Sequence, residues 1–292
     1  MRITSAMFMR NAVARLFQNR ADMMKTQERI ATQKKIEKPS DNPVGFSRAE
    51  RLREAYRQNE VFMKNIDDSE GWMDNTSSLL DQLHQYAMDA VTQASHGLDA
   101  VTTDDVRQAI ASQLTGILQE AVSVGNSTYM GKNVFAGTET KIEQPFQQNG
   151  LDVSYGGNDG KIKRRISKQI VMDLNVSGNE IMDTHFFSAM KETIEALQNG
   201  DQDAIQNALD HLKSAEKKVL KLSTVYGSKI SNLQLIKDRL ITTNENFKKF
   251  ISQEEDAVLE EELVHLKTQQ VAYQATLQTT SEVMNLSILK FM

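Results

Sequence analysis

The chain has 292 residues, with 34 Lys and Arg against 39 Asp and Glu, a net charge of −5, and no Cys. This length allows roughly one to three domains. The acidic balance gives no support to nucleic acid binding as the main task, and the absence of Cys excludes disulfides, thiolate zinc sites and Cys nucleophiles. Only three Pro, 6% aromatic residues and 14 Met are typical of long helices around an adaptable core.

The first segment, residues 3–37, is predicted to be a helix with an apolar stripe. Residues 1–38 contain neither Gly nor Pro, and they carry nine bases against three acids. The apolar residues recur at coiled-coil spacing: Ile3, Met7, Ala14, Phe17, Ala21, Met24 and Ala31. No apolar run is long enough for a signal peptide or a membrane span. We therefore expect a chain that is cytosolic or that leaves the cell without a cleaved signal.

A turn with the sequence Pro39-Ser40-Asp41-Asn42-Pro43 is predicted to end this helix and to start the next. Two prolines four residues apart interrupt a helix, and Asn42 can cap a new one with Pro43 at its first position. The new helix keeps heptad register to residue 95 through Leu52, Ala55, Phe62, Ile66, Met73, Leu80, Leu83, Ala87, Ala90 and Ala94. A shorter amphipathic helix is predicted to follow, up to Val124.

The middle of the chain is predicted to hold a small β-hairpin insert. Eight of the 14 Gly lie between residues 125 and 178. Residues 151–155 alternate as a strand, Gly156–Gly160 are predicted to turn, and residues 161–166 are predicted to return beside the first strand. Residues 170–174 are a possible third strand. A basic cluster lies here without an aromatic platform, which favours an exposed strand face over an RNA site: Lys161, Lys163, Arg164, Arg165 and Lys168.

The second half is predicted to be a short helix stopped by Asn199-Gly200, then a very long helix, and then a last helix that runs to the end. The very long helix has apolar residues at heptad positions: Ile205, Leu209, Leu212, Val219, Tyr226, Ile230, Leu233, Leu240 and Phe247. Capping-box spacing from Ser252 to Glu255 predicts a joint near residue 250. The last helix repeats at alternating fours and threes through Leu259, Leu263, Leu266, Gln270, Tyr273, Leu277, Thr280 and Met284. We infer that the two chain ends pair with each other. Their short amphipathic helices bury little alone and need a further partner.

Charged and titratable residues give no catalytic site. The run from Glu254 to Glu262 contains acids and no base, and it fits either a solvated face or a complement to the basic amino-terminal segment, within or between subunits. The five His lack the spacing of a helical metal-ligand pair, and acids beside His265 fit a solvated face better than a metal site. No Ser-His-Asp, paired-carboxylate or nucleophile-elbow arrangement stands out, so an enzyme has no positive support.

Both ends of the chain resemble the bacterial flagellins and their relatives. The motifs that carry this resemblance are Arg2-Ile3-Thr4-Ser5, residues 30–36, residues 39–45, Asn65-Ile66, residues 226–233 and residues 256–287. In the middle, Asn133–Thr138 with Pro145-Phe146 is similar to the Phe-Ala-Gly and Pro-Phe motif of the hook-associated members of this family, which join hook to filament. Most members have Gly where this chain has Gln33, and Gln33 predicts a first helix that continues smoothly toward Pro39.

The resemblance implies a mainly α fold, an elongated flagellin-like helical bundle and coiled coil formed by both chain ends, with a small β-hairpin domain inserted in the middle. The implied parts are an amino-terminal axial helix, two halves of a helical core around a β-rich outer domain, and a carboxyl-terminal axial helix. Their expected bounds are residues 1–40, 41–135, 136–183, 184–263 and 264–292. The two axial helices are expected to pair, and to be disordered in the free monomer.

The resemblance also implies a structural, non-enzymatic subunit without a cofactor, exported unfolded through the flagellar channel to the cell exterior. Its expected partners are copies of itself, the hook-side junction protein, flagellin and a cytosolic export chaperone. The expected assembly interface is Ile3, Met7, Ala14, Phe17, Met24, Leu259, Leu263, Leu266, Tyr273, Leu277, Met284 and Leu286. The chaperone is expected to hold Leu263, Leu266, Leu277, Leu286 and Leu289. The alternatives are flagellin itself and a cytosolic coiled-coil scaffold.

Overall fold

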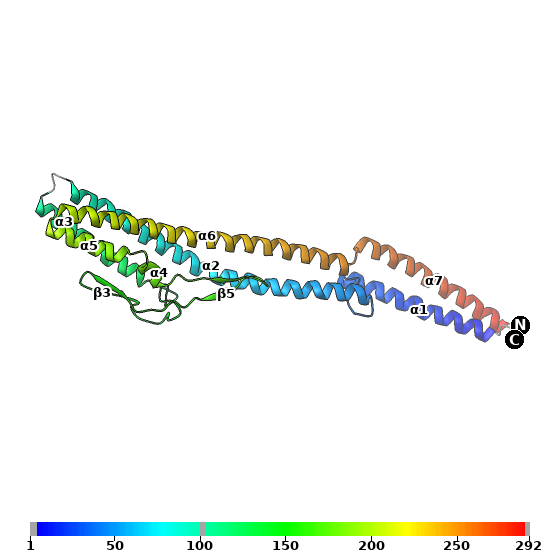
Figure 1. Cartoon of the computed structure of the whole chain (residues 1–292). Coiled ribbons are helices and arrows are strands. Elements are labelled where there is room, and N and C mark those ends of the chain that lie inside the picture. The colour runs from blue at the N-terminus through cyan, green and yellow to red at the C-terminus, as the bar shows by residue number, and fades with distance from the viewer. Residues whose placement is uncertain (1–4, 100–102, 290–292) are drawn as a thin grey trace. The chain divides into compact units, whose positions relative to one another are not determined.

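The computed structural model describes residues 5–99 and 103–289, and this part of the chain is mainly helical (Figure 1). In chain order its elements are α1 (Ser5–Thr32), α2 (Pro43–Leu98), α3 (Asp104–Gly125), β1 (Thr128–Tyr129), β2 (Lys132–Asn133), β3 (Phe146–Asn149), β4 (Asp152–Tyr155), β5 (Lys163–Arg165), β6 (Val171–Asp173), α4 (Gly178–Met182), α5 (Phe186–Asn199), α6 (Gln202–Glu255) and α7 (Leu259–Leu289). The predicted class, a mainly helical fold with a small β-rich insert, is confirmed.

The described chain divides into two compact units. The larger unit spans residues 59–242, and the smaller one combines the residues before 59 with those after 242. The long helices α2 and α6 contribute to both units. None of the described helices is long and apolar enough to cross a membrane.

The core of the larger unit is built from the predicted heptad positions of α2 and α6, with α3 packed against α5. The buried residues that recur at steps of three, four or seven positions are Ile66, Met73, Leu80, Leu83, Ala87 and Ala90 on α2, and Ile205, Leu209, Leu212, Val219, Tyr226 and Leu233 on α6. The hydroxyl of Tyr226 donates a hydrogen bond to the carbonyl of Leu174 at 2.5 Å, so this large side chain is buried without losing its polar partner. These heptad predictions are confirmed.

Two of the three strand pairs form the β-rich insert, and their pairing differs from the predicted one. β3 pairs with β4 across a turn at Gly150, and β5 pairs with β6. The predicted hairpin of residues 151–155 with residues 161–166 is therefore wrong, and Gly156–Gly160 instead connects two hairpins. The physical reason is Gly150, the first of the two loop residues between Asn149 and Asp152, because it takes the positive φ of 65° that a tight hairpin turn requires.

Aromatic side chains anchor this insert to the helices. Phe135 and Phe146 are buried, and the ring of Phe146 lies 5.2 Å from that of Tyr155 and 5.7 Å from that of Phe187, measured between centroids. The hydroxyl of Tyr155 donates to the carbonyl of Phe135 at 2.9 Å. Phe146 therefore packs the insert against α5, and the backbone of Phe135 is tied to Tyr155 of the insert.

In the smaller unit, α1 and α7 run side by side (Figure 1), and α1 ends at Thr32. Gln33 then adopts a left-handed conformation with φ of 57°, so the prediction that the helix continues toward Pro39 is wrong. The carbonyl of Gln33 accepts the N–H of Ala257 at 2.9 Å, and Lys34 forms a β-bridge with Asp256. These tertiary hydrogen bonds hold Gln33 in a conformation in which only Gly is relaxed.

Replacing Gln33 with Gly is expected to stabilise the smaller unit by roughly 0.5–1 kcal/mol, because Gly adopts positive φ without a steric cost. Gln33→Val is expected to destabilise it by more than that, because a β-branched residue fits this conformation worst. Urea unfolding of both variants, followed by circular dichroism, measures the two effects. A Gly variant that is less stable than the parent would contradict this account of the bend.

The start of α2 follows the predicted capping scheme. Pro43 is the first helical residue, and the side-chain oxygen of Asn42 accepts the N–H of Gly45 at 3.1 Å. At the other end, α6 runs without a break to Glu255, and the joint before α7 lies at residues 256–258. The joint therefore lies beyond Ser252, later than the capping-box spacing predicts.

Candidate assembly interface

The paired terminal helices α1 and α7 meet along a seam with heptad spacing. Its least exposed residues are Met9, Ala12, Leu16, Asn19, Met23, Thr26 and Ile30 on α1, and Glu262, Leu266, Gln269, Tyr273, Thr276 and Thr280 on α7. Across it, the amide of Asn19 donates to the hydroxyl of Thr276 at 3.0 Å, and Arg29 pairs with Glu262 at 3.3 Å.

This seam is unusually polar for a pair of helices. Three of its buried polar atoms have no hydrogen-bond partner among the described residues: Nε of Arg29, Oε2 of Glu262 and Oε1 of Gln269. A buried polar atom without a partner costs free energy, of the order of 1–3 kcal/mol. The seam therefore supplies little net stability to the terminal pair.

Outside the seam, the same two helices leave large apolar side chains in solvent. Met7, Phe17 and Met24 on α1 are 57%, 66% and 57% exposed. On α7 the exposed residues are Leu259, Leu263, Val264, Val271 and Leu277, and Val258 lies exposed just before the helix. Apolar residues gathered along a helix pair in this way mark an interaction surface.

The structure splits the predicted interface residues into two groups. Leu266 and Tyr273 lie in the seam, whereas Met7, Ala14, Phe17, Met24, Leu259, Leu263 and Leu277 lie on the outside. Ile3 lies outside the described residues, and the side chains of Met284, Leu286 and Leu289 are likewise outside the description. Sequence reasoning missed Met9, Leu16, Met23 and Ile30. These four residues recur every seven positions, and this second apolar row in the sequence is the signal that could have identified them.

The predicted turn between α1 and α2 is held by Asp41. Its carboxylate pairs with Lys25 at 2.9 Å and accepts the backbone N–H groups of Lys38 and Glu37 at 3.1 and 3.3 Å. Pro39, Ser40 and Asn42 are exposed, as is Pro43 at the helix start. The turn residues are therefore held by one carboxylate, and the apolar packing of this connection comes from the buried Ile36 before them.

The acidic run at the α6–α7 joint is paired with bases within the same chain. Glu255 is buried and forms ion pairs with Lys34 and Arg53. Lys34 also lies 2.6 Å from Asp256, and its hydrogen bond helps to keep the pKa of that carboxyl below the usual range, against the opposing effect of burial. Of the two interpretations left open by the sequence, intramolecular complementarity therefore accounts for these two acids.

Asp41→Asn is expected to weaken the smaller unit by about 1 kcal/mol at pH 7, and hardly at all at pH 2. Hydrogen bonds from Lys25 and from the backbone of Lys38 and Glu37 lower the pKa of Asp41 to about 2. Because the folded pKa lies below the unfolded value, the stabilisation is present above pH 4 or so and is lost as the pH falls to about 2.

Urea unfolding of parent and variant at pH 7, 4 and 2 measures this difference. Asp238→Asn, which removes an exposed carboxylate on α6, is the matched control. If the difference in unfolding free energy between Asp41→Asn and the parent is the same at pH 2 as at pH 7, the ionised carboxylate does not stabilise the turn.

The chain is similar to known flagellar proteins in both sequence and structure. Residues 3–140 match the bacterial flagellin N-terminal helical region. Flagellar hook-associated protein 3 of Escherichia coli (strain K12) is 23% identical over 99% of this chain and 98% of that protein. A flagellin of Brucella melitensis is 23% identical over 88% of this chain and 86% of that protein. The crystal structure of Bacillus cereus FlgL superposes with a TM-score of 0.60 and 21% identity, and covers 69% of this chain and 98% of that one.

Proposed function

We propose that this chain is a member of the bacterial flagellin family and a structural subunit of the flagellum that joins the hook to the filament. Its similarity to a hook-associated protein runs over 99% of its length, against 88% for the flagellin. The β-rich insert is small, with strands of three or four residues. Both features favour the junction over the filament.

The observation that carries this proposal is the terminal pair, which has unpartnered polar atoms in its seam and large apolar side chains on its outside. Such a pair is weakly stable alone, because its seam holds unpartnered polar atoms while Phe17, Leu263 and Leu277 remain in solvent. Packing against neighbouring copies covers those side chains and offsets the entropy cost of ordering both ends. The terminal helices then act as the inner, assembly-forming part of the layer, with the hook-side junction protein and flagellin as the neighbours along the axis.

Export of an unfolded chain to the cell exterior fits the same arrangement. The chain has no Cys, and its marginal terminal pair opens readily before export. A cytosolic chaperone that holds α7 would cover the exposed side chains of Leu263 and Leu277 until then. Leu266 becomes available to the same chaperone only when α7 leaves the seam.

Limited proteolysis of the purified chain tests this assembly-coupled ordering. We expect cuts near residues 40 and 250 or so, with a surviving helical core, because weakly held termini open first. Protection of both ends in a free monomer or a stable dimer would favour a self-contained coiled-coil scaffold instead.

Complementation tests the junction function directly. A strain without this gene is expected to build hooks, lose its filaments and release flagellin into the medium, and the intact gene is expected to restore filaments. If the strain instead stops making flagellin-like filament protein, the chain is the flagellin. If the protein stays inside the cell and filaments persist, the cytosolic scaffold is the better account.

A further inference from the structure

One stretch of the larger unit is acidic and free of strong bases. No Lys or Arg occurs between Lys64 and Arg107. The acids in that stretch are Asp67, Asp68, Glu70, Asp74, Asp81, Asp89, Asp99, Asp104 and Asp105. Lys237 of α6 pairs with Asp67 and Glu70 at 3.0 and 2.7 Å, which leaves Asp74 and Asp81 further along α2 without a cation in the described chain.

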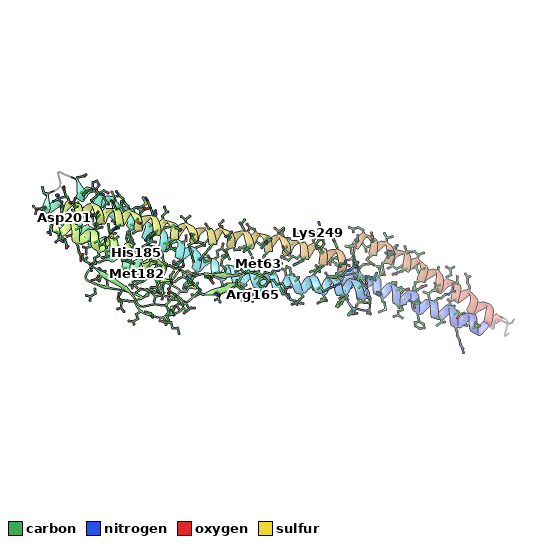
Figure 2. All side chains as sticks on the ribbon, viewed as in Figure 1. Met63, Arg165, Met182, His185, Asp201 and Lys249 are labelled. Carbon is green, nitrogen blue, oxygen red and sulfur yellow. The ribbon has the colours of Figure 1, made fainter. Side chains whose placement is uncertain are left out.

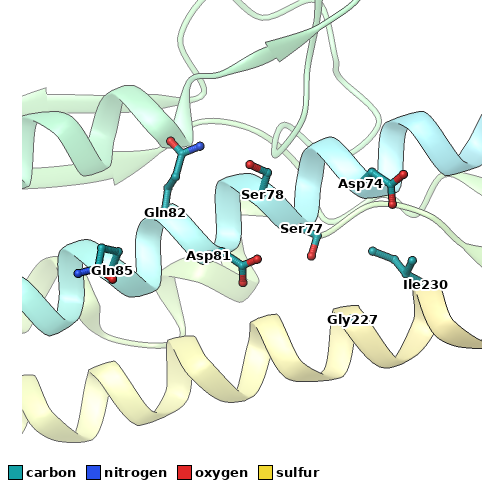
Figure 3. Close-up of a pocket in the computed structure, with 8 residues that line it drawn as sticks. All are labelled: Asp74, Ser77, Ser78, Asp81, Gln82, Gln85, Gly227 and Ile230. Carbon is teal, nitrogen blue, oxygen red and sulfur yellow. The ribbon is translucent and has the colours of Figure 1, made fainter.

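Asp74 and Asp81 line an open groove of about 600 Å³ between α2 and α6 (Figure 3). Its remaining wall includes Ser77 and, on α6, Ile230 and Gly227. Figure 3 shows the side chains of Ser77 and Asp81 on the side of α2 that faces α6. One carboxylate oxygen of Asp81 accepts the hydroxyl of Ser223 at 2.7 Å, so the groove keeps acceptors for further donors.

Gly227 keeps this groove open at a cost to its own helix. A Gly in a helix interior is about 1 kcal/mol less favourable than Ala. A Cβ added at Gly227 would meet no atom within 4 Å, so packing inside the chain does not require the Gly. The missing side chain instead lets an outside group approach the backbone of α6 between the two carboxylates.

A group of the opposite charge projects from the β-rich insert of the same unit. All three residues of β5 are exposed bases, and Lys168 in the following turn is exposed as well. Lys163 lies opposite Asp173 on β6, whereas Arg164, Arg165 and Lys168 form no ion pair with any described residue. We call these three the basic ribbon.

The basic ribbon is positioned by its backbone, which leaves its side chains available. The carbonyl of Arg165 accepts the side-chain N–H of Asn65 on α2 at 2.9 Å. Figure 2 labels Arg165 on the insert and Met63 on α2. Asn65 precedes Asp74 by nine residues, a distance of about 13.5 Å along a helix. The ribbon is thus tied to α2 upstream of the groove, and no ion pair joins the two within the described chain.

We propose that the acidic groove of one copy receives the basic ribbon of a second copy, an inference that rests on the proposed function as a layer-forming subunit. Arg guanidinium groups bind carboxylates through paired, charge-assisted hydrogen bonds, and this suits Arg164 and Arg165 to the two Asp side chains. Because groove and ribbon are different surfaces, the contact is head to tail and repeats from copy to copy. A contact of that kind generates a ring or a helical layer rather than a closed dimer.

Disulfide cross-linking tests the contact without background, because the chain has no Cys. The variant Ser77→Cys with Arg164→Cys is assembled in cells, and hook fractions are isolated, oxidised mildly and run on a non-reducing gel. A ladder of dimers and larger species of this chain is expected. Ser112→Cys with Arg164→Cys, in which the first Cys lies on the exposed side of α3, is the matched control and is expected to give no ladder. A double variant present in the hook fraction without a ladder overturns the inference, as does a cross-link only to hook or filament protein.

Charge reversal gives a second, independent readout. Arg164→Glu with Arg165→Glu is expected to lower the number of retained filaments about tenfold, and adding Asp74→Lys with Asp81→Lys is expected to restore most of them. Lys132→Glu with Lys141→Glu reverses two exposed bases outside the ribbon and is expected to have little effect. Full filament retention by the ribbon variant overturns this contact alone, whereas absence of the parent chain from hook fractions overturns the proposed function.

Discussion

Replacing Leu263 and Leu277 with Asp is expected to abolish filament attachment while the larger unit stays folded. Both side chains are exposed on the outer face of α7, so the free chain does not use them in its own core. Each buried Leu contributes about 1.5–3 kcal/mol to an apolar contact, and an unpaired carboxylate in the same place adds a desolvation cost. Because every subunit of the layer carries both changes, the loss is expected to be complete.

Motility, counts of attached filaments and flagellin in the medium measure this prediction. Gln274→Asp with Gln278→Asp places two new carboxylates on exposed positions of the same helix without removing an apolar side chain. This control is expected to swim nearly as well as the parent. Thermal unfolding of the purified variants checks that the larger unit is intact. Normal motility and filament retention in the Leu263 and Leu277 variant would show that the outer face of α7 is not part of the assembly interface.

The terminal pair shows why its interface was only partly predictable from the sequence. Leu263 and Leu266 belong to one predicted apolar stripe, which suggests that both contact the same partner. In the structure they lie on two adjacent faces of α7, and only Leu266 lies in the seam. The choice between them depends on the partner helix. Polar side chains such as Asn19 and Thr276 pair with each other across the seam, and no pattern of apolar residues reveals that.

The larger unit was predictable where the apolar repeat is long and unbroken. Heptads on α2 and α6 bury the expected side chains because each helix presents many turns with the same register. Strand pairing in the insert was not predictable from the sequence, because several Gly-containing segments could each form the turn. The Gly150-Leu151 loop carried the stronger signal, since Gly at the first loop position fits a mirror-image turn that matches strand twist.

Gln33 illustrates a different limit of sequence reasoning. A non-Gly residue disfavours positive φ by only about 1–3 kcal/mol, which tertiary contacts can outweigh. Here the N–H of Ala257 and the bridge between Lys34 and Asp256 supply such contacts. Residue type alone therefore indicated a continuous helix where the fold requires a bend.

Gly137→Ala is expected to destabilise the larger unit by about 3 kcal/mol or more. Gly137 has a φ of 69°, and a Cβ at this position would overlap the backbone carbonyl oxygen of Asn158. That carbonyl cannot move freely, because the side-chain oxygen of Asn158 accepts the N–H groups of Thr138 and Gly160 at 2.8 and 3.0 Å. The substitution therefore forces apart the loop that joins the insert to the helices.

Gly116→Ala is the matched control, because it makes the same chemical change in the middle of α3, where an added Cβ meets nothing within 4 Å. It is expected to stabilise the chain by about 1 kcal/mol through helix propensity. The melting temperature of Gly137→Ala is expected to fall by roughly 6–12 °C, given the size of the unit. An unchanged melting temperature would mean that the backbone of Asn158 can move away from the added Cβ at little cost in free energy. The Gly of the Phe-Ala-Gly motif would then have to be required by a contact outside the chain, rather than by the close approach of its own loop.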